Sequence, residues 1–212
     1  LEFDRFANDD DAFAVASAAM NFLANMEALI FDLRECQGGN PDSVTLICSY
    51  LFEGEPVHLN SLYWRDEDRT EEYWTLPEVP GARMGDVPVY VLTSKTTFSA
   101  GEEFAYDLQA LKRATLIGET TSGGAHPGSP FRLHPHFEMF VPLGMAINPV
   151  TGGNWEGVGV VPDIEVSADE ALGRAHQLAL EGVIASLDGA KTRAEQMLLA
   201  EARAAVVKLK RA

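Results

Sequence analysis

The chain has 212 residues, of which 46% are hydrophobic and 23% are charged, a composition typical of a folded domain with one sizeable core and an appendage. Its 32 aspartates and glutamates exceed its 16 lysines and arginines, so the formal net charge is −16, and with no basic patch we expect neither nucleic acid nor anionic membrane surfaces as partners. No apolar run approaches the roughly 20 residues that a bilayer-spanning helix needs, so no membrane insertion is expected.

The first third of the chain predicts two helices, a strand and a hairpin. Apolar residues recur at helical spacing in the first segment, and a proline suits the first turn of the second helix. The expected elements are a helix over Asp11–Glu27, a strand over Ala28–Leu33, a helix over Pro41–Phe52 and a hairpin over Leu59–Trp74. The opening phrase, LEFDRF, also resembles a core strand. Without an initiator methionine, the chain is expected to be a fragment or a processed product.

The middle of the chain alternates strands with a helix. A buried strand is expected over Val87–Thr93, a helix from Ser99 through Glu102–Lys112, and a short strand over Thr115–Gly118. The segment Phe131–Leu143 continues as extended structure that ends at a proline. Strands that alternate with helices indicate an α/β core with parallel strands.

The composition changes at Ala168, where an alanine- and leucine-rich pattern begins. It predicts two helices with a break at Leu187–Gly189. We therefore expect a core over residues 1–167 and a C-terminal helical extension over residues 168–212. Such an extension packs either on the core or on a second copy of the chain, so a homo-oligomer is one expectation.

Ser99 occupies the junction between the strand and the helix in the middle of the chain. A serine there can cap the helix, with Glu102 completing a capping box, and this interpretation needs no chemistry. The same position directs free backbone N–H groups and the positive end of the helix dipole at anything bound beside the hydroxyl, which suits a developing oxyanion. The motif taken alone leaves both interpretations open.

Three other segments repeat the arrangement of an apolar run followed by a glycine-rich loop. The first ends in Gly38 and Gly39, where glycine permits positive φ and close backbone approach. The others are IGETTSGGAHPG, from Ile117 to Gly128, and NWEGVGVVPDIEV, from Asn154 to Val166. Each loop is ordinary alone, but four in one domain favour a functional site.

These segments, jointly and in order, resemble the serine peptidase family that includes the C-terminal processing (tail-specific) proteases, the tricorn core protease and interphotoreceptor retinoid-binding protein. The resemblance covers about Leu1–Val166. It rests on DLRECQGG, FSAGEE, LKRATLIGETTSGG and EGVGVVPDIEV. The phrases GGAHPG and INPVTGGNWEGVGVVPD are most similar to bacterial proteins that resemble the retinoid-binding protein. The resemblance implies a crotonase-like, ClpP-like spiral core with parallel strands and flanking helices.

The resemblance also implies roles for individual residues. Ser99 matches the family nucleophile, and the oxyanion hole matches the N–H of Ala100 together with that of Gly38 or Gly39. The processing proteases carry a lysine base in the loop that here reads TSGG. The matching residue is Gly124, which cannot accept a proton, so a serine–lysine dyad is excluded at that position.

The tricorn-like pattern instead takes a glutamate from the E-x-x-G-V-x-P-D motif, which Glu156 matches, and a histidine from upstream of the region covered here. His126 is the best internal candidate for the base, because it lies two residues after the missing lysine and residues two apart in an extended segment share a face. The alternatives are a histidine outside this chain and a plain loop role for His126. His134 and His136 lack a third ligand at metal-site spacing, so a surface strand is expected there and no metal or cofactor is predicted.

Two functions from different classes follow. The first is a serine peptidase that hydrolyses peptides or unfolded proteins through an acyl-enzyme on Ser99. The second is a non-catalytic carrier of an apolar, retinoid-like or lipid-like ligand on the same fold.

Cys36 and Cys48 are too few for a disulfide scaffold, and Cys36 is expected to be a structural thiol. The resemblance favours an extracytoplasmic location, either periplasmic or secreted.

Overall fold

A computed structural model describes residues 1–209 of the chain. Its centre is a four-stranded parallel sheet with the strand order β1-β4-β5-β9. The strands are β1 (Leu29–Asp32), β4 (Val89–Thr93), β5 (Thr115–Gly118) and β9 (Ile164–Glu165). The first three match the strands expected from the sequence, and the parallel α/β class is confirmed.

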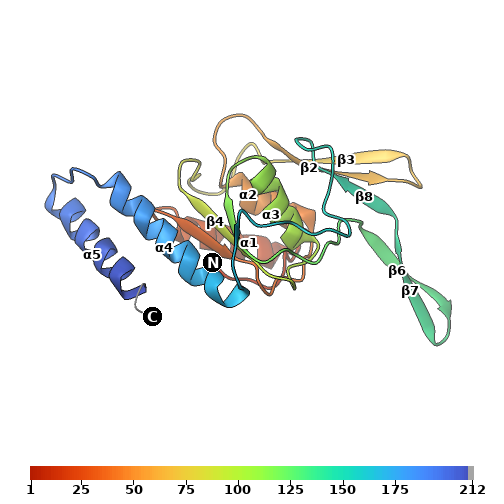
Figure 1. The fold of residues 1–212 in the computed structure, drawn as a ribbon. Coiled ribbons are helices and arrows are strands. Elements are labelled where there is room, and N and C mark those ends of the chain that lie inside the picture. The colour runs from red at the N-terminus through yellow and green to blue at the C-terminus, as the bar shows by residue number, and fades with distance from the viewer. Residues whose placement is uncertain (210–212) are drawn as a thin grey trace.

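Helices cover both faces of this sheet (Figure 1). The period of two along each strand divides the apolar side chains between the faces. Phe31, Val91 and Leu116 belong to the large core cluster that α2 and α3 cover, whereas Leu92 and Ile117 pack with alanines of α4. The helices are α1 (Asp10–Phe22), α2 (Pro41–Ser49), α3 (Ala100–Ala110), α4 (Ala168–Ser186) and α5 (Arg193–Leu209), and α5 packs along α4.

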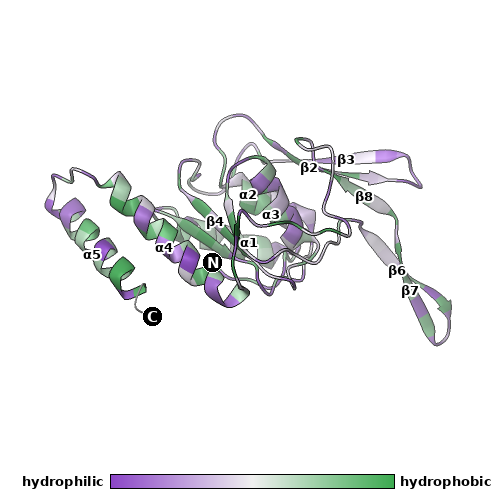
Figure 2. Cartoon of the chain, in the orientation of Figure 1, coloured by the Kyte–Doolittle hydropathy of each residue, from purple (hydrophilic) through white to green (hydrophobic). Residues whose placement is uncertain are grey.

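A second, antiparallel sheet extends from the core and has the order β3-β2-β8. Its strands are β2 (His58–Trp64), β3 (Arg69–Trp74) and β8 (Gly144–Ile147). The expected hairpin over Leu59–Trp74 is confirmed as β2 and β3. Figure 2 colours much of β4 as hydrophobic and part of β3 as hydrophilic, in accordance with their central and edge positions.

The segment expected as one extended run is instead a hairpin of β6 (Gly128–His134) and β7 (Phe137–Pro142). The chain reverses at Pro135 and His136, and it then enters β8, a strand that the sequence did not predict. This hairpin projects away from the rest of the molecule at the end opposite to α5 (Figure 1).

Two further expectations differ from the structure at the N-terminal end. LEFDRF forms only isolated bridges, Glu2 to Asp32 and Phe6 to Gly39, because its pairing partners are the end of β1 and a loop. The first helix stops at Phe22, where the backbone N–H groups of Leu23, Ala24 and Met26 close a turn that leads the chain into β1. Within residues 1–209, no helix is long and apolar enough to cross a membrane.

Candidate active site

Ser99 lies in a sharp turn between the carboxyl end of the sheet and α3. Its backbone has φ 53° and ψ −119°, a conformation that costs a residue with a side chain about 1–3 kcal/mol. Ser99 and Glu102 form the capping box expected from the sequence, and outside this box the hydroxyl has no hydrogen-bond partner among residues 1–209. A strained serine between a strand and a helix has the backbone geometry of an active-site nucleophile.

The buried carboxylate of Glu102 holds this turn in place through hydrogen bonds. Its side chain is fully buried and accepts hydrogen bonds from the N–H of Ser99 at 2.9 Å and from the Thr121 hydroxyl at 2.5 Å. The N–H groups of Gly123 and Gly124 donate to the same carboxylate at 2.6 and 2.9 Å. The sequence predicted a helix cap at this residue, but the carboxylate also joins the serine turn to the glycine loop about twenty residues later.

Two backbone amides beside Ser99 have no hydrogen-bond partner among the described residues. One is the N–H of Ala100, the first residue of α3, and the other is that of Gly39. Burial raises the pKa of the Cys36 thiol, and the N–H of Gly38, directed at that thiol, partly opposes the rise. Ala100 and Gly39 therefore fit the expected pair of oxyanion donors better than Gly38 does.

Gly38 nevertheless allows the close approach of the two loops. A Cβ on Gly38, where φ is +94°, would stand 2.6 Å from the Ser99 Cβ and 3.0 Å from the Ala100 nitrogen. Only glycine fits against the serine turn at this distance.

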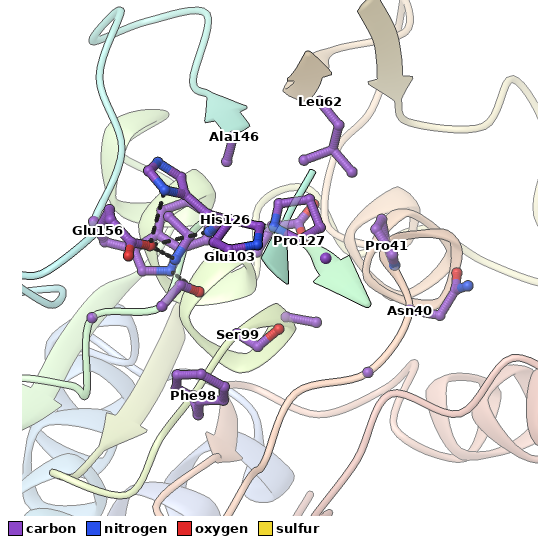
Figure 3. Close-up of a pocket in the computed structure, with 18 of the residues that line it drawn as sticks. Asn40, Pro41, Leu62, Phe98, Ser99, Glu103, His126, Pro127, Ala146 and Glu156 are labelled. Atoms are coloured by element: carbon purple, nitrogen blue, oxygen red, sulfur yellow. Dashed lines mark hydrogen bonds and ion pairs between the residues drawn. The ribbon is translucent and has the colours of Figure 1, made fainter. Parts of the chain in front are cut away.

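Ser99 opens into a pocket of about 690 Å³. Figure 3 shows its surroundings, with Ser99 and Phe98 on one side and Asn40 and Pro41 on another. Segments that are distant in sequence meet here because the loops at the carboxyl edge of a parallel sheet converge. Of the predicted site, Gly39, Ser99, Ala100, His126 and Glu156 line the pocket and Gly38 does not. The other lining residues include Gly124 and the apolar side chains of Leu62, Trp64, Phe140, Ala146 and Trp155.

His126 and Glu156 lie together in this pocket. One oxygen of Glu156, Oε2, accepts from the N–H of Ala125 at 2.7 Å and of His126 at 3.1 Å, and it is 3.7 Å from the His126 Nδ1. In Figure 3 the dashed lines run from Glu156 to the segment of His126, and none joins His126 to Ser99. The carboxylate is thus placed to orient the imidazole, while the contact from imidazole to Ser99 is not formed in this state.

Gly124, which the resemblance matches to the lysine of the processing proteases, has no space for a side chain. A Cβ there would lie 2.2 Å from the ring of Phe98, and the indole N–H of Trp155 donates to the Gly124 carbonyl at 3.1 Å. The packing of Phe98 against this loop therefore leaves no room for a lysine at position 124.

A pair of carboxyl groups behind the pocket was not predicted from the sequence. Glu103 lines the pocket but is only 5% exposed, and Asp107, one helical turn further along α3, is fully buried. Burial raises the pKa of Glu103 to about 7, and burial also raises the pKa of Asp107 well above its ordinary value. The signal in the sequence was the spacing of Ser99, Glu103 and Asp107, each four residues apart and thus on one helical face.

The remaining chemical candidates lie outside this site. His134 and His136 are exposed at the end of the β6–β7 hairpin, with ring centroids 5.5 Å apart, and the described part of the chain contains no group of three or more ligands that could hold a metal. Cys36 and Cys48 are free and buried.

Comparison with known proteins identifies the family. A tail-specific protease of Haemophilus influenzae (strain ATCC 51907 / DSM 11121 / KW20 / Rd) is 32% identical over 103 residues, which are 46% of this chain and 13% of that protein. The photosystem II D1 C-terminal processing protease has a similar fold, with a TM-score of 0.62 and 21% identity over 79% of this chain and 42% of the other. Mature CPAF has a TM-score of 0.68 and 14% identity over 91% of this chain and 52% of the other.

The chain thus spans only 13% of the curated relative and about half or less of the two solved structures. The two solved structures support the fold alone. The family model supports membership of the family, because it matches most of the chain. Since the model described as "Peptidase family S41" matches residues 1–166, the chain belongs to peptidase family S41.

Proposed function

We propose that this chain carries the catalytic site of a serine peptidase of the C-terminal processing type, with Ser99 as the nucleophile. The observation that carries the proposal is the strained serine turn, which faces a 690 Å³ pocket beside two backbone amides without partners in the described chain. Such preorganised donors stabilise a developing oxyanion without any reorganisation during the reaction.

In the proposed reaction, the Ser99 hydroxyl attacks the carbonyl carbon of a peptide bond. The carbonyl oxygen becomes an oxyanion that accepts hydrogen bonds from the N–H groups of Ala100 and Gly39. The tetrahedral intermediate then expels the amine of the leaving peptide, and water hydrolyses the acyl-enzyme to regenerate the serine.

We propose His126 as the general base and Glu156 as the group that orients it. The carboxylate faces Nδ1 at 3.7 Å, so Nε2 is the nitrogen left to take the serine proton. Hydrogen bonds of this kind are often long in the absence of substrate and shorten when it binds. A histidine supplied from outside this chain is the competing source of the base, and the experiment below distinguishes the two.

The proposed substrates are peptides or unfolded proteins, as in the relatives named for tail-specific and C-terminal processing activity. The polar and charged groups in the pocket, Ser99, Glu103, His126 and Glu156, do not favour the alternative of an apolar-ligand carrier. We further propose an extracytoplasmic location, and a division into a catalytic core (1–167) and a supporting helical extension (168–212).

The test is labelling by a fluorophosphonate probe together with hydrolysis of an unfolded protein substrate. The natural chain should react at one serine, and Ser99→Ala should abolish both signals while the nearby Ser122→Ala retains them. His126→Asn should slow labelling by about 100-fold or more. Labelling that is unchanged in Ser99→Ala would refute the proposed nucleophile, and normal labelling of His126→Asn would move the base outside this chain.

A further inference from the structure

We propose that Glu103 selects substrates with a basic side chain, arginine or lysine, at the residue whose carbonyl is attacked. This inference rests on the proposed peptidase function and specifies which substrates that site takes. It follows from the position of Glu103, from the absence of a cationic partner for it within residues 1–209, and from the side chains that line the pocket beside it.

The position of Glu103 is set by the helix that begins at the nucleophile. Glu103 lies one turn after Ser99 on the same face of α3, and both residues line the same pocket (Figure 3). A side chain that reaches Glu103 therefore belongs to a substrate residue directly beside the attacked carbonyl.

Glu103 lacks a cationic partner anywhere in residues 1–209. The groups whose electrostatic interaction or hydrogen bonding reaches it are Asp107 on the same helix, Asp42 and Cys48 on α2, Tyr73 on β3 and the amide of Asn60 on β2. Each is acidic or neutral. The nearby guanidinium of Arg113 is committed to the backbone carbonyls of three other residues, Leu51, Met84 and Val87.

The surroundings of Glu103 contain a further unsatisfied polar atom. The Oδ2 of Asp107 is buried and has no hydrogen-bond partner within the described chain, whereas the amide of Asn60 is directed at Glu103 and opposes part of the rise in its pKa. Buried carboxyl groups without a cation are costly to ionise, because water no longer solvates the charge. A cation that enters from the pocket would relieve this cost, whereas an apolar tip would leave it in place.

The pocket walls suit the stem of a long basic side chain. Leu62, Ala146 and Phe140 provide apolar surface in the same pocket that Glu103 lines. Arginine and lysine place their methylene groups along such surface and keep the charged end at a polar partner. The net charge of −16 further favours the approach of basic peptides.

Binding of matched peptides to the Ser99→Ala chain tests the inference without turnover. One peptide carries arginine at the tested position and the other carries citrulline, which has the same shape and no charge. Isothermal titration calorimetry at pH 8 should show the arginine peptide bound roughly 10-fold to 100-fold more tightly. Adding Glu103→Gln should reduce this ratio below about 3-fold, and Glu138→Gln, on the exposed hairpin, should leave it unchanged.

Equal affinities, tighter binding of citrulline, or no binding of either peptide to the Ser99→Ala chain would overturn the inference. The ratio of arginine to citrulline affinity in the Ser99→Ala chain does not depend on whether Glu103→Gln folds, because that chain retains Glu103. Fluorophosphonate labelling of the natural chain, run in parallel, separates the two proposals. Labelled Ser99 without arginine preference refutes only the specificity, whereas arginine preference without labelling refutes only the catalysis.

Discussion

The buried carboxylate of Glu102 provides the sharpest test of how the site is held together. We expect Glu102→Gln to lower the free energy of unfolding by about 4 kcal/mol. Oε1 accepts from Thr121 and Gly123, and Oε2 accepts from Ser99 and Gly124. Glutamine keeps one acceptor oxygen and turns an amide NH₂ toward the other two donors.

The magnitude follows from those two donors. Each buried donor left without an acceptor costs about 1–3 kcal/mol, so the pair costs about 2–6 kcal/mol. For a chain of this size, each kcal/mol lowers the melting temperature by about 2–4 °C, so a loss of about 4 kcal/mol corresponds to roughly 8–16 °C. Labelling of Ser99 should fall as well, because the N–H of Ser99 is one of the groups that Glu102 positions.

The measurement is urea and thermal unfolding followed by circular dichroism, with Glu119→Gln as the matched control. Glu119 lies close in sequence to the same loop, but its carboxylate makes only exposed contacts with Lys95, a 3.4 Å ion pair with the side chain and a 3.5 Å hydrogen bond from the backbone N–H, so its loss should cost less than about 1 kcal/mol. If the two variants unfold at the same urea concentration, Glu102 does not organise the turn and the reasoning is wrong.

Three other predictions concern single residues. Gly124→Lys should leave labelling of Ser99 no faster, because the Phe98 ring occupies the space of its side chain, and a faster rate would contradict the packing argument. Gly39→Ala should cost at least about 2 kcal/mol in urea unfolding, because its Cβ would stand 2.1 Å from a backbone oxygen, whereas Gly152→Ala, with nothing within 4 Å, should cost only about 1 kcal/mol; equal losses would refute the clash. Because the pKa of Glu103 is raised from 4.5 to about 7, the folded state binds more protons than the unfolded state between these values, and stability should fall as pH rises through this window. Glu103→Gln should flatten this dependence in urea titrations at pH 5 and pH 8, and an identical slope in both proteins would exclude Glu103 as its source.

The sequence predicted the elements whose signals are local. The strand before Ser99, the helix after it and the hairpin over Leu59–Trp74 each have their own periodicity, and all three appear in the structure. The sequence predicts one extended run in place of the β6–β7 hairpin, because the turn at Pro135 and His136 contains no glycine that would mark it. Strand β8 was missed because its short sequence, GMAI, pairs with β2, which is distant along the chain.

The candidate site was likewise predictable only where short sequence motifs mark its residues. The resemblance to the family assigned Ser99, Glu156 and the glycine turn, and the structure places them in one pocket. It could not reveal that Glu102 collects donors from a loop twenty residues later, since that depends on tertiary packing. Nor could it reveal that Glu103 reaches the pocket, because the orientation of α3 against β2 decides which helical face is turned there.

The β6–β7 hairpin gives the pocket a wall that is independent of the core. Its two strands pair with each other, and most of their side chains are exposed, including Phe137 and Leu133 at 67% and 64%. A two-stranded ribbon of this kind is marginally stable in isolation. Amide protons along this ribbon should therefore exchange with deuterium far sooner than those of β4 and β5. The side of the pocket next to Phe140 would then open locally while the turn that holds Ser99 stays in place.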